Sequence, residues 1–149
     1  MRAKDCMKKE VKWVNATNTV CEVAKTMSEN HIGSVVVCDD TQKVTGIVTD
    51  RDIILRSIAC DKDYKNTPIS EIMTTNVITV QSDADLTEVI KQMSQNQVRR
   101  IPVTENNQLV GIISLGDLAW KKEVSNQTVA STFEQICGCM QHEENKNAE

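Results

Sequence analysis

The sequence predicts a mixed α/β (α+β) protein built from two β-α-β-β-α repeats related by a pseudo-twofold axis. Residues 3–37 match residues 69–103 without a gap, and after one extra residue in the first copy, residues 46–49 align with residues 111–114. Two copies are fewer than the three or more that a solenoid needs to bury its faces. They favour a closed domain instead, with ligand clefts where the repeats meet.

Each copy predicts the same order of elements. Extended segments at residues 11–14 and 77–80 precede two helices, and these begin at Thr19-x-x-Glu22 and Asp85-x-x-Glu88, which have the spacing of capping boxes. The apolar positions of both helices follow the i, i+3, i+4, i+7 pattern of an amphipathic helix. The expected buried faces consist of Val20, Val23, Ala24 and Met27 in the first copy, and of Leu86, Val89, Ile90 and Met93 in the second.

Two short apolar strands and a second helix complete each copy. The strands are separated by polar turns, and the second helix starts near Thr49 in the first copy and near Ser114 in the second. The repeats therefore occupy residues 1–66 and 67–120. Residues 121–149 form a C-terminal extension, in which the apolar spacing predicts a short helix followed by a disordered tail.

Composition and charge exclude several classes of protein. The chain of 149 residues is 40% hydrophobic and 26% charged, which is ordinary for a globular protein. The sequence has no apolar run of about 20 residues, and its start does not have the pattern expected of a signal peptide, so we expect a cytoplasmic protein without a membrane partner. The net charge of −4 argues against nucleic acid as a partner. Six scattered cysteines are expected to stay reduced in the cytoplasm.

Three stretches carry a resemblance to a known family. Residues 46–52, of sequence GIVTDRD, and residues 98–103, VRRIPV, followed by residues 111–117, GIISLGD, resemble a pair of CBS domains, also called a Bateman module. The resemblance covers roughly residues 3–120 and is to the stand-alone type. It implies a regulatory, non-enzymatic homodimer that binds an adenosine-containing ligand such as AMP, ATP, NAD or S-adenosylmethionine, as in energy sensing. An unidentified protein partner would be regulated, and no catalytic residue, catalytic cofactor or metal ligand is assigned.

The resemblance also implies two clefts, each combining the hydroxyl–Asp motif of one copy with the first strand of the other. Cleft A would comprise Thr49 and Asp52, with Val77 and Ile78 beside an adenine, and Arg99, Arg100 and Pro102 on the phosphate side. Cleft B would comprise Ser114 and Asp117, with Val11, Lys12, Ser34 and Val36.

The two clefts differ in charge. Gly33-Ser34 of the first copy aligns with Arg99-Arg100 of the second. An arginine is always charged and binds phosphate oxygens in a bidentate fashion. We therefore expect cleft A to favour a phosphorylated ligand, and cleft B to be empty or to take a less charged adenosyl compound.

Competing interpretations remain open at this point. A Thr-x-x-Asp pair serves equally well as a helix N-cap, and both roles can coexist. The two arginines also fit a solvated surface pair. The alternative function is an interaction or redox-responsive module with vestigial clefts. Cys137, Cys139 and His142 could ligate zinc, but a closed tetrahedral site needs a fourth ligand.

Overall fold

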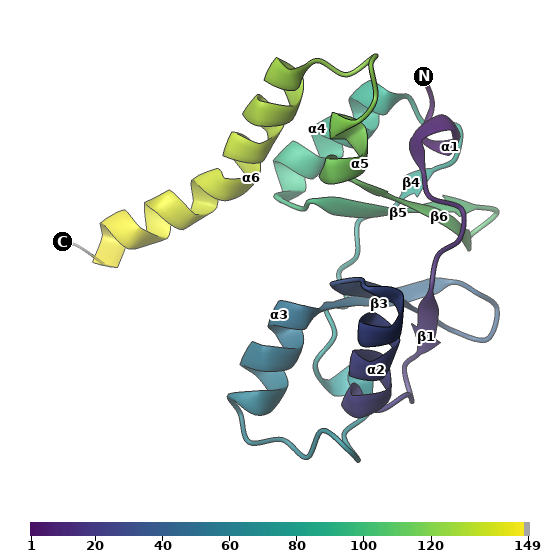
Figure 1. Ribbon diagram of the computed structural model, residues 1–149, viewed down its shortest axis with the longest axis vertical. Helices are drawn as coiled ribbons and strands as arrows, with labels where there is room; N and C mark the ends of the chain where they lie inside the picture. Colours follow the sequence, from purple (N-terminus) through teal and green to yellow (C-terminus); the bar gives the residue numbers. More distant parts are fainter. Residues whose placement is uncertain (148–149) are drawn as a thin grey trace. The chain divides into compact units, whose positions relative to one another are not determined.

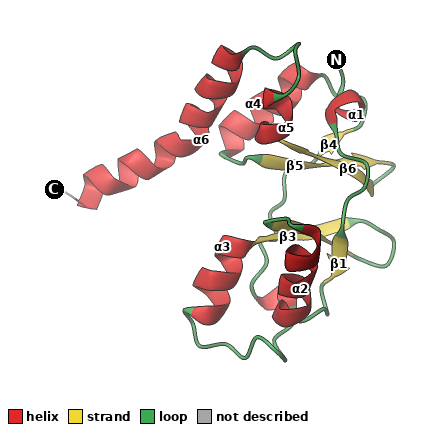
Figure 2. Ribbon diagram, viewed as in Figure 1, coloured by secondary structure: helices red, strands yellow, loops and turns green. Residues whose placement is uncertain are grey.

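The computed structural model describes the backbone of residues 1–147 and the side chains of residues 1–138. The chain divides into two compact units. Unit 1 comprises Met1–Lys9, Ile78–Glu105 and the chain from Val110 onward, and unit 2 comprises Glu10–Val77 and Asn106–Leu109. Each unit has a small β-sheet with helices against one face (Figure 2), which confirms the predicted mixed architecture of two similar repeats.

Unit 2 contains a three-stranded sheet in which β1 pairs parallel with β2, and β2 pairs antiparallel with β3. The predicted inner face of its first long helix is confirmed, with Val20, Val23 and Met27 buried and Ala24 partly buried against the same aliphatic core. The capping box at Thr19 is also formed. In chain order the elements are β1 (Trp13–Asn15), α2 (Val20–Asn30), β2 (Ser34–Cys38), β3 (Val44–Thr49), α3 (Asp50–Ile53), the π-helix η1 (Ile54–Ile58) and the 3-10 helix η2 (Ile69–Glu71).

Unit 1 has the sheet order β4-β5-β6, with β4 parallel to β5. Leu86, Val89 and Met93 are buried on the inner face of its long helix α4, as predicted, and Ile90 is partly buried. In chain order the elements are α1 (Ala3–Cys6), β4 (Val80–Gln81), α4 (Leu86–Asn96), β5 (Arg100–Glu105), β6 (Gln108–Ser114), α5 (Leu115–Ala119) and α6 (Asn126–Asn147).

The opening segment of each repeat packs in the unit formed mainly by the other repeat. The purple helix α1 lies beside the teal and green elements of unit 1 (Figure 1), where Ala3 and Cys6 belong to the core. In unit 2, Ile69 and Ile72 from the start of the second repeat are fully buried. The compact units therefore do not follow the repeat boundaries at residues 66 and 67, because the chain changes unit after Lys9 and after Val77.

Backbone hydrogen bonds fasten these exchanged segments. The N–H of Lys8 donates to the carbonyl of Ile112 at 2.9 Å and that of Ile112 donates back at 3.1 Å. The corresponding pair in unit 2 is Ile47 and Thr74, at 3.0 and 2.9 Å. Each bridge lies next to a glycine of the strand that receives it, so the exchanged backbone can approach closely.

Three local predictions differ from the structure. The extended segments expected from residues 11 and 77 pair as strands only from Trp13 and Val80, because the chain is still passing from one unit to the other. Asp85 makes no capping hydrogen bond with its side chain. Instead, the Met1 carbonyl accepts the N–H of Leu86, and Glu88 accepts a hydrogen bond from Gln92.

The C-terminal extension also differs from the expectation. A single helix, α6, runs from Asn126 to Asn147 and covers most of the segment expected to be disordered. Its first half packs against α4 and α5. Residues 148–149 lie outside the described residues. Among the described residues, no helix is both long and apolar enough to cross a membrane.

Replacing Gly46 with alanine should destabilise the protein by about 1–3 kcal/mol. An added Cβ would lie 2.5 Å from Met73 Sδ and 3.1 Å from the Thr74 carbonyl oxygen, so the exchanged segment would have to move. The free energy of unfolding, measured by denaturant titration, checks this. Gly116→Ala is the control, because its Cβ would meet only Ser114 Oγ at 3.7 Å. Equal stability of both variants would contradict the packing argument.

Candidate functional site

The Thr49–Asp52 motif caps helix α3 in unit 2. The Thr49 N–H donates to Asp52 Oδ2 at 3.0 Å, and the Asp52 N–H donates to Thr49 Oγ1 at 3.1 Å. The other carboxylate oxygen, Oδ1, lies 3.7 Å from Arg56 Nε. That guanidinium also donates to the Ile72 carbonyl. The capping interpretation of the motif is therefore confirmed, and it uses one of the two Asp52 oxygens.

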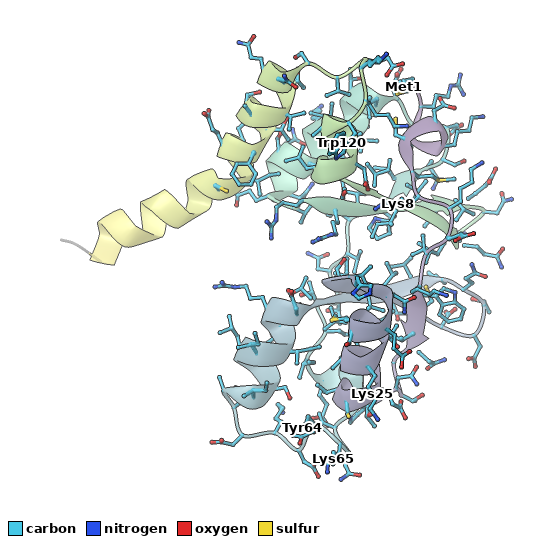
Figure 3. The ribbon with its side chains drawn as sticks, viewed as in Figure 1. Met1, Lys8, Lys25, Tyr64, Lys65 and Trp120 are labelled. Atoms are coloured by element: carbon cyan, nitrogen blue, oxygen red, sulfur yellow. The ribbon has the colours of Figure 1, made fainter. Side chains whose placement is uncertain are left out.

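The Ser114–Asp117 motif caps α5 in unit 1 in the same way but is more fully engaged. Asp117 Oδ2 accepts from the Ser114 N–H at 3.3 Å and from the Ser114 hydroxyl at 2.7 Å, and the Asp117 N–H donates to that hydroxyl oxygen at 3.0 Å. Asp117 Oδ1 forms an ion pair with Lys8 Nζ at 3.1 Å. Lys8 (Figure 3) comes from the exchanged opening segment, so this segment contributes charge as well as backbone.

These contacts set the charge state of Asp117. Burial raises the pKa of its carboxyl, but the hydrogen bonds from Ser114 and Lys8 and the Lys8 charge outweigh burial and hold that pKa below its usual value. Both oxygens of Asp117 are thus occupied by protein donors, whereas among the described residues Asp52 Oδ1 has only a long contact with Arg56. Within the described residues, the Thr49 hydroxyl accepts a hydrogen bond and donates none.

The second difference between the motifs lies in the residues beside them. The Asp50 N–H donates to the Gly33 carbonyl at 3.0 Å, and the Leu115 N–H donates to the Arg99 carbonyl at 2.8 Å. An added Cβ at Gly33 would come within 3.1 Å of Asp50 Oδ2. The first repeat therefore places a carboxylate where the second places an apolar side chain next to Arg99.

Arg99 and Arg100 lie at the start of β5 and line a cavity of unit 1 together with Ser114. Arg99 is exposed and Arg100 is half-buried. In the described part of the chain, neither guanidinium forms an ion pair with a carboxylate. Among the residues with described side chains, the pair therefore presents positive charge without an ion-pair partner.

The other predicted site residues are distributed over both units. Val36 and Pro102 are buried, each between two core residues of its strand, so alternation directs them to the sheet face away from that core. In the first repeat, Ser34 pairs with Thr49 across β2 and β3. Of the cleft A residues, unit 2 holds Thr49, Asp52 and Val77, and unit 1 holds Ile78, Arg99, Arg100 and Pro102; of the cleft B residues, unit 2 holds Val11, Lys12, Ser34 and Val36, and unit 1 holds Ser114 and Asp117.

The five cysteines from Cys6 to Cys137 are all free thiols. Burial, assisted by the charge of Asp39, raises the pKa of the Cys38 thiol to about 11. Burial also raises the pKa of Cys6. Among the residues with described side chains, no three His, Cys, Asp or Glu converge as metal ligands. Cys139 and His142 of the alternative zinc set lie outside those residues.

The structure thus consists of two compact units that exchange their opening segments, each with a hydroxyl–Asp cap after a strand. The family model described as "CBS domain" matches residues 3–58 and 69–121. The chain belongs to the CBS-domain family and carries two tandem CBS domains. The matched ranges follow the sequence repeats, so the resemblance noted from the motifs is confirmed.

Named relatives have a similar length and fold. The CBS domain-containing protein YhcV of Bacillus subtilis is 36% identical over 89% of this chain and 93% of its own. Hypoxic response protein 1 of Mycobacterium tuberculosis is 30% identical over 93% of this chain and 95% of its own. A crystal structure of Hypoxic Response Protein I, with two coordinated zinc ions, has a TM-score of 0.74 at 32% identity, covering 80% of this chain and 97% of that one.

A further solved structure contains small-molecule ligands. The CBS domain pair of protein MJ0100, in complex with 5′-methylthioadenosine and S-adenosyl-L-methionine, has a TM-score of 0.71 and is 29% identical. The similarity covers 80% of this chain and 93% of that chain. Both ligands of that protein contain an adenosyl group.

The lowered pKa of Asp117 predicts a specific pH dependence of stability. A carboxyl whose pKa falls on folding stabilises the folded state above its unfolded pKa, about 3.9, and this contribution is lost as the pH falls through the folded value. The stability difference between the native protein and Asp117→Asn should therefore shrink below about pH 4. Thermal unfolding measured from pH 7 to pH 3 checks this, and a constant difference would contradict it.

Proposed function

We propose that this protein is a regulatory sensor that binds an adenosine-containing ligand in cleft A. The observation that carries the proposal is that the Thr49–Asp52 motif has hydrogen-bonding groups that its helix cap does not use. Asp52 Oδ1 has no short protein donor, and the Thr49 hydroxyl has an unused proton in the described part of the chain. A carboxylate accepts hydrogen bonds from neighbouring hydroxyls, so ribose is the matching group. The adenosyl ligands of the MJ0100 pair support the same class.

Phosphate groups of the ligand would be held by Arg99 and Arg100. Both are free of carboxylate partners among the described residues, and a guanidinium fork matches phosphate geometry. In the first repeat the equivalent positions are Gly33 and Ser34, with Asp50 alongside. A carboxylate there would repel phosphate. Cleft B is therefore proposed to stay empty or to take a less charged adenosyl compound.

The consequence of binding would be regulatory rather than catalytic. AMP, ATP, NAD and S-adenosylmethionine share the adenosyl group, and the first three would report on the energy state of the cell. The ligand would bias two arrangements of the protein by its different affinity for each, typically a coupling of 1–3 kcal/mol. A protein partner, yet to be identified, would recognise one arrangement.

The sensor is proposed to work as a homodimer. The helical segment α3–η1 exposes Ile54, Leu55 and Ile58, the last at 60% of its surface. Tyr64, exposed at the same end of unit 2 as Lys25 (Figure 3), lies beside an apolar groove of about 670 Å³. We define Ile54, Leu55 and Ile58 as the α3–η1 patch. Clustered exposed apolar side chains of this kind mark interaction sites.

The redox-responsive alternative receives less support. Thiol reactivity depends on the thiolate form. The raised pKa values of Cys6 and Cys38 keep both buried thiols protonated near neutral pH. An interaction module with vestigial clefts would bind no adenosyl ligand at all, which calorimetry can decide.

Asp52→Ala should weaken adenosyl-ligand binding about tenfold or more, because a hydrogen bond to a charged group contributes about 1.5–3 kcal/mol. Asp117→Ala removes the equivalent cap bond and should change affinity less than threefold. Calorimetric titration of the reduced protein with AMP, ATP, NAD and S-adenosylmethionine gives the comparison. Equal losses in the two variants would remove the asymmetry between the clefts, and no heat with any ligand would reject the sensor.

Ile58→Glu should convert the dimer to a monomer. The side chain is mostly exposed within one chain, so folding should tolerate the charge, whereas burying it in an apolar interface is costly. Sedimentation velocity on the native protein and the variant measures the change. Lys43→Glu, an exposed position outside the patch, is the control. A dimer that persists in Ile58→Glu would place the interface elsewhere.

A further inference from the structure

Unit 1 contains a cavity of about 640 Å³ that lies between the start of β5, helix α5 and helix α6. Its volume falls in the usual range for small-molecule sites. Arg99 and Arg100 supply its charged wall, and Ser114, a residue of the predicted cleft B, lines it beside them. Leu115 and Ala119 of α5 line it together with residues of α6, so most of the wall is apolar.

Helix α6 presents one continuous face to this cavity. Asn126, Val129, Ala130 and Phe133 all line it and have the i, i+3, i+4, i+7 spacing of a single helical face. Asn126 and Phe133 are two turns apart, about 10 Å along the helix axis. A polar amide and an aromatic ring therefore stand at separate points of the same wall.

The rest of the contact surface of α6 anchors this wall. Val129 and Ile136 pack against the core of unit 1. Thr132 is 3% exposed, and its hydroxyl donates to the Thr128 carbonyl. The Gln97 side chain donates to the Gln135 carbonyl at 3.4 Å. The wall is thus fixed by contacts that do not involve Phe133.

Phe133 itself remains 46% exposed, although it is the single phenylalanine of the chain. Phe133 is the aromatic side chain that lines this cavity, and the exposed part of its ring is accessible to a ligand. Aromatic rings pack favourably against other flat rings. A ligand group with a planar ring would therefore suit this wall.

The electrostatics add a second requirement. Among the residues with described side chains, no carboxylate lines the cavity. The carboxylate of Asp117, which follows the lining residue Gly116 in sequence, is held by Ser114 and Lys8. The cavity therefore combines two unneutralised guanidiniums with an apolar, ring-bearing wall. Its chemistry matches a ligand that has phosphates at one end and a planar group at the other.

We propose that this cavity receives the second base of a dinucleotide, so that the ligand class of the protein is an NAD-type dinucleotide. Arg99 and Arg100 hold the pyrophosphate, Phe133 stacks on the base that is not adenine, and Asn126 hydrogen-bonds a polar substituent of that base. The inference rests on the proposed function, in which the same arginines bind the phosphates of an adenosyl ligand. AMP ends at its phosphate and leaves the cavity unfilled.

The test is calorimetric titration of the full-length reduced protein with NAD and, separately, with AMP. We expect NAD to bind more tightly than AMP. Phe133→Ala should lower NAD affinity by roughly three- to tenfold, the usual effect of a lost aromatic pair, and should leave AMP affinity unchanged within twofold. Phe133→Leu keeps an apolar wall without the ring, so its NAD affinity should lie between those of the native protein and Phe133→Ala. Glu134→Ala, an exposed neighbour on α6, should change neither ligand.

The outcomes separate this inference from the proposed function. AMP binding as tightly as NAD, or Phe133→Ala weakening both ligands equally, overturns the dinucleotide assignment and leaves the adenosyl sensor in place. Absence of NAD binding overturns the assignment whatever AMP does. Absence of heat with AMP, ATP, NAD and S-adenosylmethionine alike overturns the proposed function as well. Since Phe133 is half-exposed, its substitution should not impair folding, and circular dichroism confirms this for each variant.

Discussion

The exchange of opening segments between the repeats is the constraint on which the rest of the molecule depends. Neither repeat completes a core from its own residues, because Ala3 belongs to the core of unit 1 and Ile69 to that of unit 2. The glycines at 46 and 111 permit the exchanged methionines, Met73 and Met7, to lie directly on the receiving strand. The exchange also brings Lys8 to Asp117. Core packing and site electrostatics thus have a common origin.

The hydroxyl–Asp motifs show how one side chain can serve both folding and binding. In both units one carboxylate oxygen satisfies the N-terminus of a short helix, a requirement of any helix end. The second carboxylate oxygen is not needed for the cap, and the cation beside it determines whether it remains free to bind a ligand. Lys8 occupies it in Asp117, whereas Arg56 approaches Asp52 only at 3.7 Å and is shared with the Ile72 carbonyl. Equivalent motifs therefore differ in what they can offer a ligand.

Much of this architecture could be predicted from the sequence because it is local. The buried faces of α2 and α4 follow from helical periodicity, and the capping bonds of Thr19, Thr49 and Ser114 follow from i, i+3 spacing. Features that depend on distant segments could not be predicted in this way. The carbonyl that satisfies the start of α4 comes from Met1, and no local pattern indicates it.

The same limit explains what sequence reasoning missed at the site. Arg99 and Arg100 were identified by aligning the repeats, but Asn126 and Phe133 lie on a helix that has no counterpart in the first repeat. Comparing the copies therefore gave no signal for them. In the sequence, Phe133 is one of several apolar residues spaced along one side of a helix. This spacing does not indicate that its ring remains half-exposed.

The composition of unit 1 has a consequence for the order in which the protein forms during synthesis. Unit 2 consists almost entirely of residues 10–77, so its parts leave the ribosome in succession. Unit 1 needs both residues 1–9 and residues beyond 110. Residues 1–9 must therefore wait, unpaired, until the residues beyond 110 have been made. Contacts between such distant segments slow folding, so the unit that holds the arginine-lined cavity closes last.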